Sequence, residues 1–253
     1  MALLWSYRED GSLYQVRAAG SSRRLYTDGV LHTQYNPRRI VTGSVWDLLW
    51  LPLFFRAAPR IGRVLVLGVG AGAVIRQLDA LFRPQKIVGV EKNAVHLRVA
   101  REFFGVTPQM ATLHLSDATE FVHRYRGVKF DLVIDDLFCG NRGIPSRAVS
   151  CDHHWMKQLV RHLVDEGTLC VNFADWREFR EAPFSRWFGS DQRFRSAFEL
   201  RAPETENVVA ALLPWRVEPA SLRAHLRGTP ALAGALRAGQ LRYRVRTITS
   251  GRR

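Results

Sequence analysis

The sequence predicts an α/β fold in which a doubly wound, mostly parallel sheet of seven strands follows a small N-terminal β-domain. From residue 63 onward, short apolar runs alternate with segments of helical periodicity, which is typical of a parallel sheet with helices on both faces. A glycine-rich loop, 68–72, joins the first of these runs to the first helical segment. Residues 3–34 instead contain short alternating runs separated by turn signals, which indicates hairpins.

The first 58 residues form the predicted β-hairpin domain and its linking helix. Residues 13–17 and 23–26 alternate as strands do, and Asp28-Gly29 marks a tight turn. Asn36-Pro37 breaks the pattern, and residues 45–55 are expected to form a helix that reaches Pro52.

Residues 59–220 are predicted to form the Rossmann-like cofactor-binding domain. Its strands are expected at residues 64–67, 86–90, 111–115, 130–134 and 168–173, and its helices at 73–82, 94–104, 118–125 and 153–164. Residues 135–150 are expected to form a loop, and 194–200 with 207–213 a closing antiparallel pair. Residues 221–253 are expected to be helical over 221–239 and otherwise a basic tail.

Composition indicates a folded cytoplasmic protein. A hydrophobic fraction of 47% provides a full core. The three cysteines are too widely spaced for a disulfide framework or a zinc site, which fits a reducing compartment. The N-terminus does not resemble a secretory signal, and the longest apolar stretch, 48–55, contains Pro52 and is too short to cross a bilayer. We therefore expect no membrane partner.

The net charge of +14 by itself suggests a nucleic-acid partner or another anion. However, arginine supplies nearly all of it and is spread along the chain, as a GC-rich genome would produce. The densest basic segment, 237–253, is interpreted as a partly ordered tail. The sequence therefore leaves a nucleic-acid partner open without favouring one.

The strongest chemical signal is the glycine loop. Gly68, Gly70 and Gly72 let the backbone turn sharply and approach a ligand without an intervening Cβ atom. The helix that follows presents unpaired N–H groups at its N-terminus. These features predict a nucleotide-like cofactor at the loop.

Two acidic residues further indicate that this cofactor contains an adenosyl group. Glu91 ends the second strand, about 20 residues after the loop, where a carboxylate binds ribose hydroxyls. Asp117 follows the third strand and is expected, with Ala118, to contact adenine. Asp117 also has the spacing of a helix N-cap with Glu120, and the two roles are compatible.

The chain resembles the spermidine synthase family of polyamine aminopropyltransferases, whose core is a methyltransferase-like Rossmann fold. The resemblance covers about residues 14–213. It rests on the segments Leu25-Tyr26-Thr27-Asp28-Gly29, Leu51-Pro52-Leu53, Gly68 to Val74, Asp117 to Phe121 and Phe130 to Asp136. It implies S-adenosylmethionine, or its decarboxylated form, as cofactor and a homodimer joined through the N-terminal β-domain.

The chain departs from the family on the polyamine side. Ala71 replaces the loop aspartate that helps hold the amino-acid end of the cofactor. After the fourth strand, Asp136 is kept, but Cys139 replaces the aspartate that deprotonates the attacking amine. A thiol with a reference pKa of about 8.5 is a poor substitute for that base. Cys139 is therefore interpreted as a pocket-lining thiol.

From these residues we expect an adenosylmethionine-dependent transferase that methylates an unidentified small-molecule acceptor. Asp136 is the candidate catalytic residue, with Asp135 as the second candidate. The alternatives are polyamine aminopropyl transfer, with Asp135 or Asp136 as the base, and a non-catalytic scaffold that keeps the fold. No metal site is expected.

Overall fold

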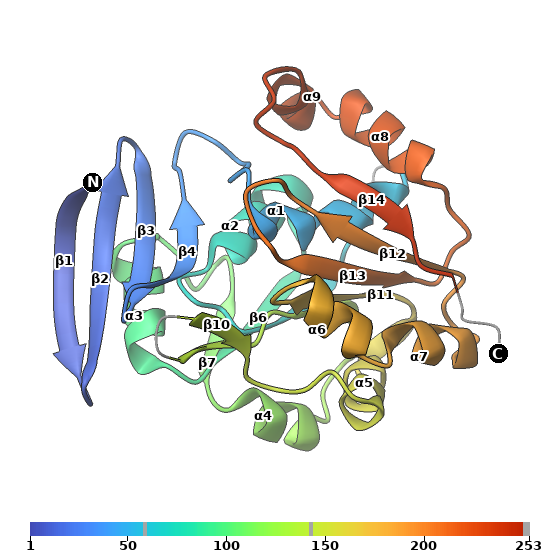
Figure 1. Ribbon diagram of the computed structural model, residues 1–253, viewed down its shortest axis with the longest axis horizontal. Coiled ribbons are helices and arrows are strands. Elements are labelled where there is room, and N and C mark those ends of the chain that lie inside the picture. Colours follow the sequence, from blue (N-terminus) through green and yellow to red (C-terminus); the bar gives the residue numbers. More distant parts are fainter. Residues whose placement is uncertain (58–59, 142–143, 250–253) are drawn as a thin grey trace.

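The computed structural model describes residues 1–57, 60–141 and 144–249. These residues form a four-stranded antiparallel sheet, a two-stranded hairpin and an eight-stranded central sheet (Figure 1). The central sheet has the strand order β14-β12-β13-β11-β8-β5-β6-β7. Its members from β11 to β7 are parallel, whereas β13, β12 and β14 are antiparallel to their neighbours. The predicted mostly parallel sheet is confirmed, with one strand more than expected.

The strands fall into the three sheets as follows. The N-terminal sheet contains β1 (Ala2–Glu9), β2 (Ser12–Ala19), β3 (Ser22–Thr27) and β4 (Val30–Tyr35). The hairpin contains β9 (Phe138–Asn141) and β10 (Ile144–Arg147). The central sheet contains β5 (Arg63–Leu67), β6 (Lys86–Glu91), β7 (Thr112–Leu115), β8 (Phe130–Asp135), β11 (Leu163–Phe173), β12 (Ser196–Arg201), β13 (Val208–Leu213) and β14 (Arg244–Thr247).

The helices connect these strands. They are α1 (Val45–Leu48), the 3-10 helix η1 (Leu51–Phe55), α2 (Ala73–Phe82), α3 (Ala94–Glu102), α4 (Ala118–Arg124), α5 (His153–Val160), α6 (Trp176–Glu181), α7 (Phe184–Ser190), α8 (Pro219–Gly228) and α9 (Pro230–Arg237). No helix among the described residues is long and apolar enough to span a membrane.

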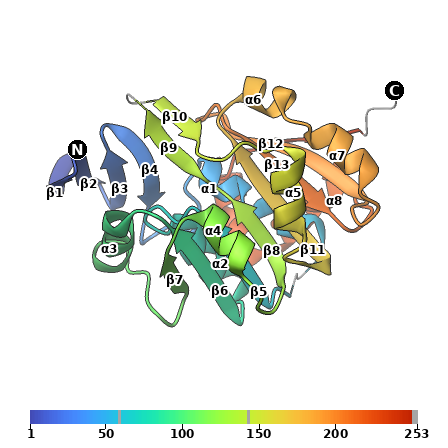
Figure 2. The ribbon, with the colours of Figure 1, turned by 90° about the horizontal axis from the view of Figure 1, so that it is seen from below.

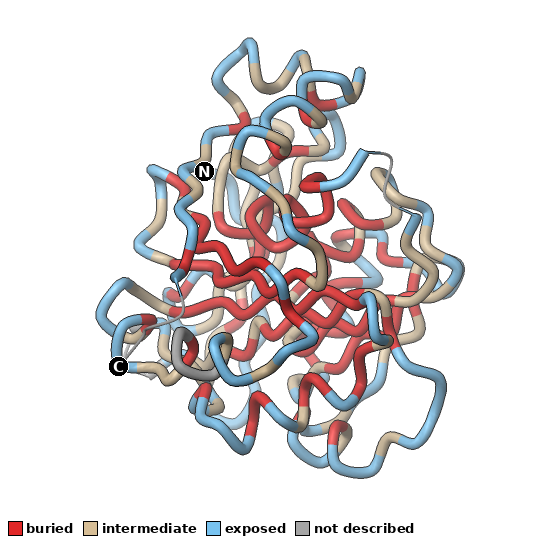
Figure 3. The backbone as a smooth tube through the Cα atoms, turned by 90° about the vertical axis from the view of Figure 1, so that its right-hand side faces the viewer, coloured by how far each residue is buried: buried red, intermediate tan, exposed pale blue. Residues whose placement is uncertain are grey.

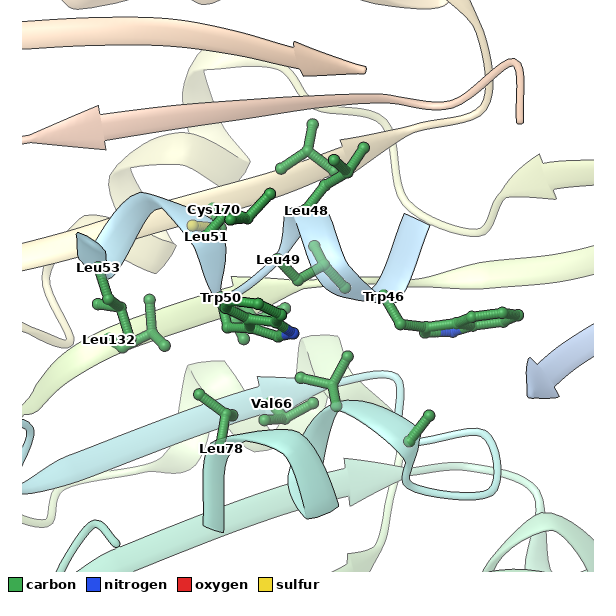
Figure 4. Packing of buried hydrophobic residues seen from close by; sticks show 14 of the residues in the cluster. Trp46, Leu48, Leu49, Trp50, Leu51, Leu53, Val66, Leu78, Leu132 and Cys170 are labelled. Atoms are coloured by element: carbon green, nitrogen blue, oxygen red, sulfur yellow. The ribbon is translucent and has the colours of Figure 1, made fainter. Parts of the chain in front are cut away.

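The central sheet separates two hydrophobic cores, and buried residues concentrate along its strands (Figure 3). Alternate residues of β5 divide between them: Val64 and Val66 belong to one core, Leu65 and Leu67 to the other. The first core packs α1, η1, α2 and α8 against the sheet and contains the fully buried Trp50 (Figure 4). The second packs α4, α5 and α6 against the opposite face.

The predicted N-terminal hairpins are present. Asp28 and Gly29 both have positive φ, 51° and 83°, at the turn between β3 and β4, and the Asp28 carboxylate accepts a hydrogen bond from the Leu13 amide at 2.7 Å. This sheet packs on α3 through Val16 and Leu25. It therefore stands beside the carboxyl ends of the central strands, where cofactor sites form in α/β folds.

Several predicted boundaries are wrong for local reasons. The helix expected at 45–55 is divided into α1 and η1, because Pro52 lacks the N–H that an α-helix would bond to the Leu48 carbonyl. The helix expected at 153–164 ends at Val160, and β11 begins at Leu163. The loop expected at 135–150 contains the β9–β10 hairpin.

The expected C-terminal tail is also wrong in part. Residues 244–247 form β14, which pairs with β12 at the edge of the central sheet. A strand in this place needs long-range pairing, so the local sequence alone does not reveal it. Residues 250–253 of the predicted tail lie outside the described residues.

Candidate functional site

A cavity of about 540 Å³ opens at the carboxyl ends of β5, β6 and β8. Its wall combines the central sheet, the N-terminal sheet and the β9–β10 hairpin, which lies beside β4 (Figure 2). Gly140 of β9 packs against Val30 of β4, closing that side. The predicted residues Gly68, Gly70, Glu91, Asp117, Ala118 and Asp136 all line this cavity.

The three loop glycines are required by conformation and packing. Gly68, Gly70 and Gly72 have φ values of +84°, +52° and +85°. A Cβ atom on Gly68 would overlap the Asp136 carbonyl oxygen, and one on Gly72 would lie 2.6 Å from the Val106 side chain. Gly72 is the N-cap of α2 and is not among the residues that line the cavity. Its place indicates a packing role, whereas the Gly68 and Gly70 backbones face the site.

Glu91 ties the end of β6 to the glycine loop. Its Oε2 accepts hydrogen bonds from the amides of Val69 at 3.1 Å and Gly70 at 2.9 Å, and its Oε1 accepts one from Asn93 at 2.9 Å. Burial raises the pKa of this carboxyl. The three backbone hydrogen bonds oppose that rise because they stabilise the ionised form. Oε1 accepts only one of these hydrogen bonds and keeps a second lone pair, so the carboxylate can hold the loop and still accept a ligand hydroxyl.

Asp117 is the N-cap of α4, and its two oxygens differ. Oδ1 accepts hydrogen bonds from the Thr119 amide at 2.8 Å, the Thr119 hydroxyl at 2.5 Å and the Glu120 amide at 3.4 Å. These bonds, the Thr119 hydroxyl first, lower the pKa of Asp117. Because they all use Oδ1, Oδ2 remains available to a donor such as an exocyclic amine. The capping role is confirmed, and it is compatible with the predicted adenine contact.

Asp136 extends into the cavity from the end of β8. Its Oδ1 accepts a hydrogen bond from Asn172 Nδ2 at 2.7 Å, and Asn172 Oδ1 in turn accepts one from Asn207 at 3.1 Å. Burial first, and then the neighbouring Asp135 carboxylate, raise the pKa of Asp136 to about 6. A carboxyl with this pKa is still ionised at neutral pH and accepts a proton more readily than an ordinary aspartate.

Asp135 lies behind the wall. Its Oδ2 accepts hydrogen bonds from Arg147 Nη2 at 2.7 Å and from the Trp155 indole at 2.8 Å. The side chains of Asp135 and Arg147 are 0% and 2% exposed, and Asp135 is not among the residues that line the cavity. This placement fits a structural ion pair and not the second candidate base that the sequence suggested.

Ala71 and Cys139, the two departures from the family pattern, have different environments. Ala71 is fully buried among the residues that join the N-terminal sheet to α3, and its amide donates to the Thr33 hydroxyl at 2.8 Å. Cys139 lines the cavity, and its thiol donates to the Ser146 carbonyl within the hairpin at 3.6 Å. The Cys139 contact fits the predicted lining thiol.

Among the polar wall residues that were not predicted as site residues, four form notable contacts. Asn172 and Asn207 orient Asp136, and a polar residue inside the otherwise apolar run 169–173 was the available signal for the first. His32 and His96 have ring centroids 4.8 Å apart, and burial lowers the pKa of each to about 4. Both imidazoles are therefore neutral at pH 7. Nothing in the local sequence brings them together, because they come from β4 and α3.

Comparison with known proteins gives relatives of one kind. No family model matches the chain. It is 29% identical over 170 residues to polyamine aminopropyltransferase 2 of Caldanaerobacter subterraneus subsp. tengcongensis, covering 64% of this chain and 55% of that protein. It is 27% identical over 117 residues to the polyamine aminopropyltransferase of Vibrio vulnificus, covering 45% and 38%. The chain thus spans about half the length, or less, of the curated relatives it matches.

Solved structures share the fold. A probable spermidine synthase from Corynebacterium glutamicum matches with a TM-score of 0.72 and 14% identity over 98% of this chain and 91% of that one. Human methyltransferase-like protein 13, in complex with SAH, matches with a TM-score of 0.62 and 16% identity over 76% and 91%. The sequence relatives and the fold agree with the resemblance found in the sequence.

Proposed function

We propose that this chain, which is spermidine synthase-like in sequence and methyltransferase-like in fold, transfers an aminopropyl group from a decarboxylated adenosylmethionine-type sulfonium to an amine. From the sequence we expected methyl transfer. The curated relatives support the aminopropyl alternative instead, since both are named polyamine aminopropyltransferases. Methyl transfer becomes the second candidate.

The observation that carries this proposal is the charge of the cavity. The ionisable residues of its wall include four carboxylates but only one ammonium, Lys92, although the chain as a whole carries a net charge of +14; the carboxylates are Asp28, Glu91, Asp117 and Asp136. A sulfonium and a protonated amine are both cations, and carboxylates at close range attract them despite a distant positive surface.

The wall also fits the rest of such a cofactor. The Gly68 and Gly70 backbones allow close approach, Glu91 is placed to accept ribose hydroxyls, and Asp117 Oδ2 to accept the adenine amine. When bound, the cofactor supplies an electrophilic carbon beside its positive sulfur. The remaining contribution of the protein is to orient an amine and to remove its proton.

Asp136 is the proposed acceptor of that proton. The amine nitrogen forms its new bond to carbon as the carbon–sulfur bond breaks, the bonding pair stays on sulfur, and the surplus proton on nitrogen passes to Asp136. Asn172 orients the carboxylate through Oδ1, so Oδ2 is the oxygen left to take the proton. Burial supplies the raised pKa that favours this transfer.

Methyl transfer is supported by Ala71 and Cys139, where the family has aspartates that serve the aminopropyl group and its acceptor. Residue 71 is a buried alanine, so the loop has no carboxylate at that point for a cofactor amine. This candidate predicts tighter binding of the full cofactor, with its carboxylate, than of the decarboxylated one.

Titration calorimetry with both cofactor forms separates the candidates. Aminopropyl transfer requires tighter binding of the decarboxylated form and formation of spermidine from putrescine. Preference for S-adenosylmethionine, with no spermidine formed, would support methyl transfer. The Glu91→Ala variant serves as the binding control. Loss of the ribose contact should weaken its binding of both cofactor forms at least tenfold, which is roughly 1.4 kcal/mol or more. Absence of binding by the native chain would favour the scaffold alternative.

A further inference from the structure

The polar side chains along the carboxyl edge of the central sheet change from charged to neutral partway along the candidate site. Taken in the strand order β7-β6-β5-β8-β11-β13, this edge presents to the cavity Asp117, Glu91, the glycine loop, Asp136, Asn172 and Asn207. The first three form the cofactor side of the proposed site. Because the cofactor covers β5 to β7, the acceptor amine reaches Asp136 from β11 and β13, and we call this part of the cavity the acceptor end.

The fourth carboxylate of the cavity wall, Asp28, also lies on the cofactor side. Its neighbour Thr27 contacts the His96 ring, with Oγ1 and Nε2 2.8 Å apart, and His96 belongs to α3, which follows β6. The Asp28 carboxylate accepts a hydrogen bond from the Leu13 amide. Among the described residues that line the cavity, Asp136 is therefore the one carboxylate of the acceptor end.

Other carboxylates close in the chain to the acceptor end have partners elsewhere, and none of them lines the cavity. They are Asp135, which pairs with Arg147, Asp175, which caps α6, Glu178, which accepts from the Ala174 amide, and Glu204, which pairs with Arg242. Glu206 is exposed and lies outside the cavity wall as well. A second ammonium on the acceptor would thus find no carboxylate to balance its charge.

The polar groups of the acceptor end, besides Asp136, are two side-chain amides. An ionised carboxylate only accepts hydrogen bonds, so Asn172 directs Nδ2 to Asp136 and Oδ1 to Asn207, at 2.7 and 3.1 Å. Asn207 uses its second N–H on the Phe173 carbonyl at 3.2 Å, and its Oδ1 accepts from the Thr205 hydroxyl. Within the described part of the chain, Asn172 keeps one N–H and one lone pair, and Asn207 Oδ1 keeps one lone pair.

This set of free groups matches a hydroxyl better than an ammonium. A hydroxyl donates one hydrogen bond and accepts others, so it can use both the lone pairs and the N–H of the amides. An ammonium only donates, and beside Asn172, which is 2% exposed, it would lose its hydration with no opposite charge to replace it. The same end of the cavity has apolar walls for an alkyl chain: Leu137, Phe138, Pro145, Ala148 and Val149.

We propose that the preferred acceptor is an amino alcohol, a primary amine whose far end carries a hydroxyl, and that a diamine is a poorer substrate of the same site. This inference rests on the aminopropyl transfer proposed above. The amine nitrogen bonds to the aminopropyl carbon, the carbon–sulfur bonding pair stays on sulfur, and the proton on nitrogen passes to Asp136. The hydroxyl takes no part in the reaction and remains in the product, a secondary amine.

The test compares three acceptors that share one carbon chain. Putrescine carries an ammonium at the far end, 4-aminobutanol a hydroxyl, and butylamine neither. With the decarboxylated cofactor, product formation is measured by mass spectrometry. We expect kcat/KM for 4-aminobutanol to exceed the values for both other amines by roughly tenfold or more, mainly through a lower KM, because the far group acts in binding.

The outcomes separate this inference from the proposed function. Transfer to none of the three amines would contradict aminopropyl transfer itself. Transfer that favours putrescine would overturn the amino alcohol alone, and so would equal rates for butylamine and 4-aminobutanol, since the far group would then not be recognised.

A pair of variants tests the position of the far group. Asn207→Asp places a carboxylate at the acceptor end and should shift the preference toward putrescine by roughly tenfold or more. The control Glu206→Gln removes a charge from the exposed neighbour outside the cavity and should leave the native preference unchanged. A folded Asn207→Asp protein with the native preference would contradict the proposal, as would a loss of putrescine turnover in Glu206→Gln. If Asn207→Asp does not fold, the three acceptors on the native protein decide the question.

Discussion

Asp135 and Asp136 are adjacent in the chain, yet they occupy opposite environments. Successive side chains at the end of a strand point to opposite faces, so one carboxylate lies behind the cavity wall and the other within it. Arg147 and Trp155 neutralise the first by charge and hydrogen bonding. Among the described residues, the second is hydrogen-bonded by the Asn172 amide, and burial is the largest cause of its raised pKa.

The Asp136→Asn substitution should reduce the transfer rate by roughly 10²- to 10⁴-fold, the usual contribution of a general base. In the native enzyme, kcat/KM should decline below an apparent pKa of about 6, because the protonated carboxyl can no longer accept a proton. Steady-state rates between pH 5 and 8 test both effects. Full activity in the variant, or a pH profile that keeps the same acid limb, would exclude Asp136 as the base.

The same substitution should leave stability unchanged or increase it at pH 7 to 8. Because the pKa of Asp136 is raised in the folded state from 3.8 to about 6, the folded protein binds the proton more tightly than the unfolded chain does. The native protein therefore loses stability as pH rises from about 4 to 6, and the neutral asparagine removes this loss. Thermal unfolding of both proteins at pH 4, 6 and 8 measures it.

At the scale of elements, the β9–β10 hairpin forms a wall of the cavity, and the side chain of Arg147 ties it to the central sheet. Arg147, at the end of β10, donates to the Asp135 carboxylate at 2.7 Å and to the Asn172 carbonyl of β11 at 2.5 Å. It thereby joins the hairpin to β8 and β11 at once. The groups that accept hydrogen bonds from Arg147 are buried, so water cannot readily take the place of its guanidinium group.

The Arg147→Met substitution should lower the free energy of unfolding by about 3–5 kcal/mol, since it leaves the buried Asp135 charge without its partner. Denaturant unfolding measures this loss. The double variant Arg147→Met, Asp135→Asn should recover part of it. As the control, Arg177→Met, which breaks an ion pair whose arginine is 85% exposed, should cost less than about 1 kcal/mol. A small loss for Arg147→Met would show that the hairpin is held by other contacts.

At the scale of the whole molecule, charge is distributed unevenly. An acidic cavity at the carboxyl ends of the strands and an arginine-rich cavity at α8, α9 and β14 coexist in a chain with a net charge of +14. The net charge therefore predicts neither surface. The acidic cavity can attract a cation in such a chain because its own field dominates within about a Debye length of its residues.

The homodimer implied by the family resemblance stays a prediction, and the outer strand of the N-terminal sheet is the surface to test. Leu3 and Leu4 of β1 are 56% and 47% exposed at the sheet edge. If this strand forms the contact, Leu3→Asp with Leu4→Asp should convert a dimer to a monomer. Light scattering after size-exclusion chromatography measures the mass. A native monomer, or a variant that remains dimeric, would contradict it.

The periodicity of the sequence determined the alternating strands and helices, and the glycine loop with Glu91 and Asp117 was recognisable. Each of these features depends on residues close together in the chain or at the ends of predicted strands. Only the tertiary structure decided which of the paired aspartates faces the cavity and which neutral side chains support it. Asn172 contacts Asp136, Asn207 contacts Asn172, and β14 completes the sheet, all through contacts between distant segments. Such contacts depend on packing in three dimensions, which local periodicity does not encode.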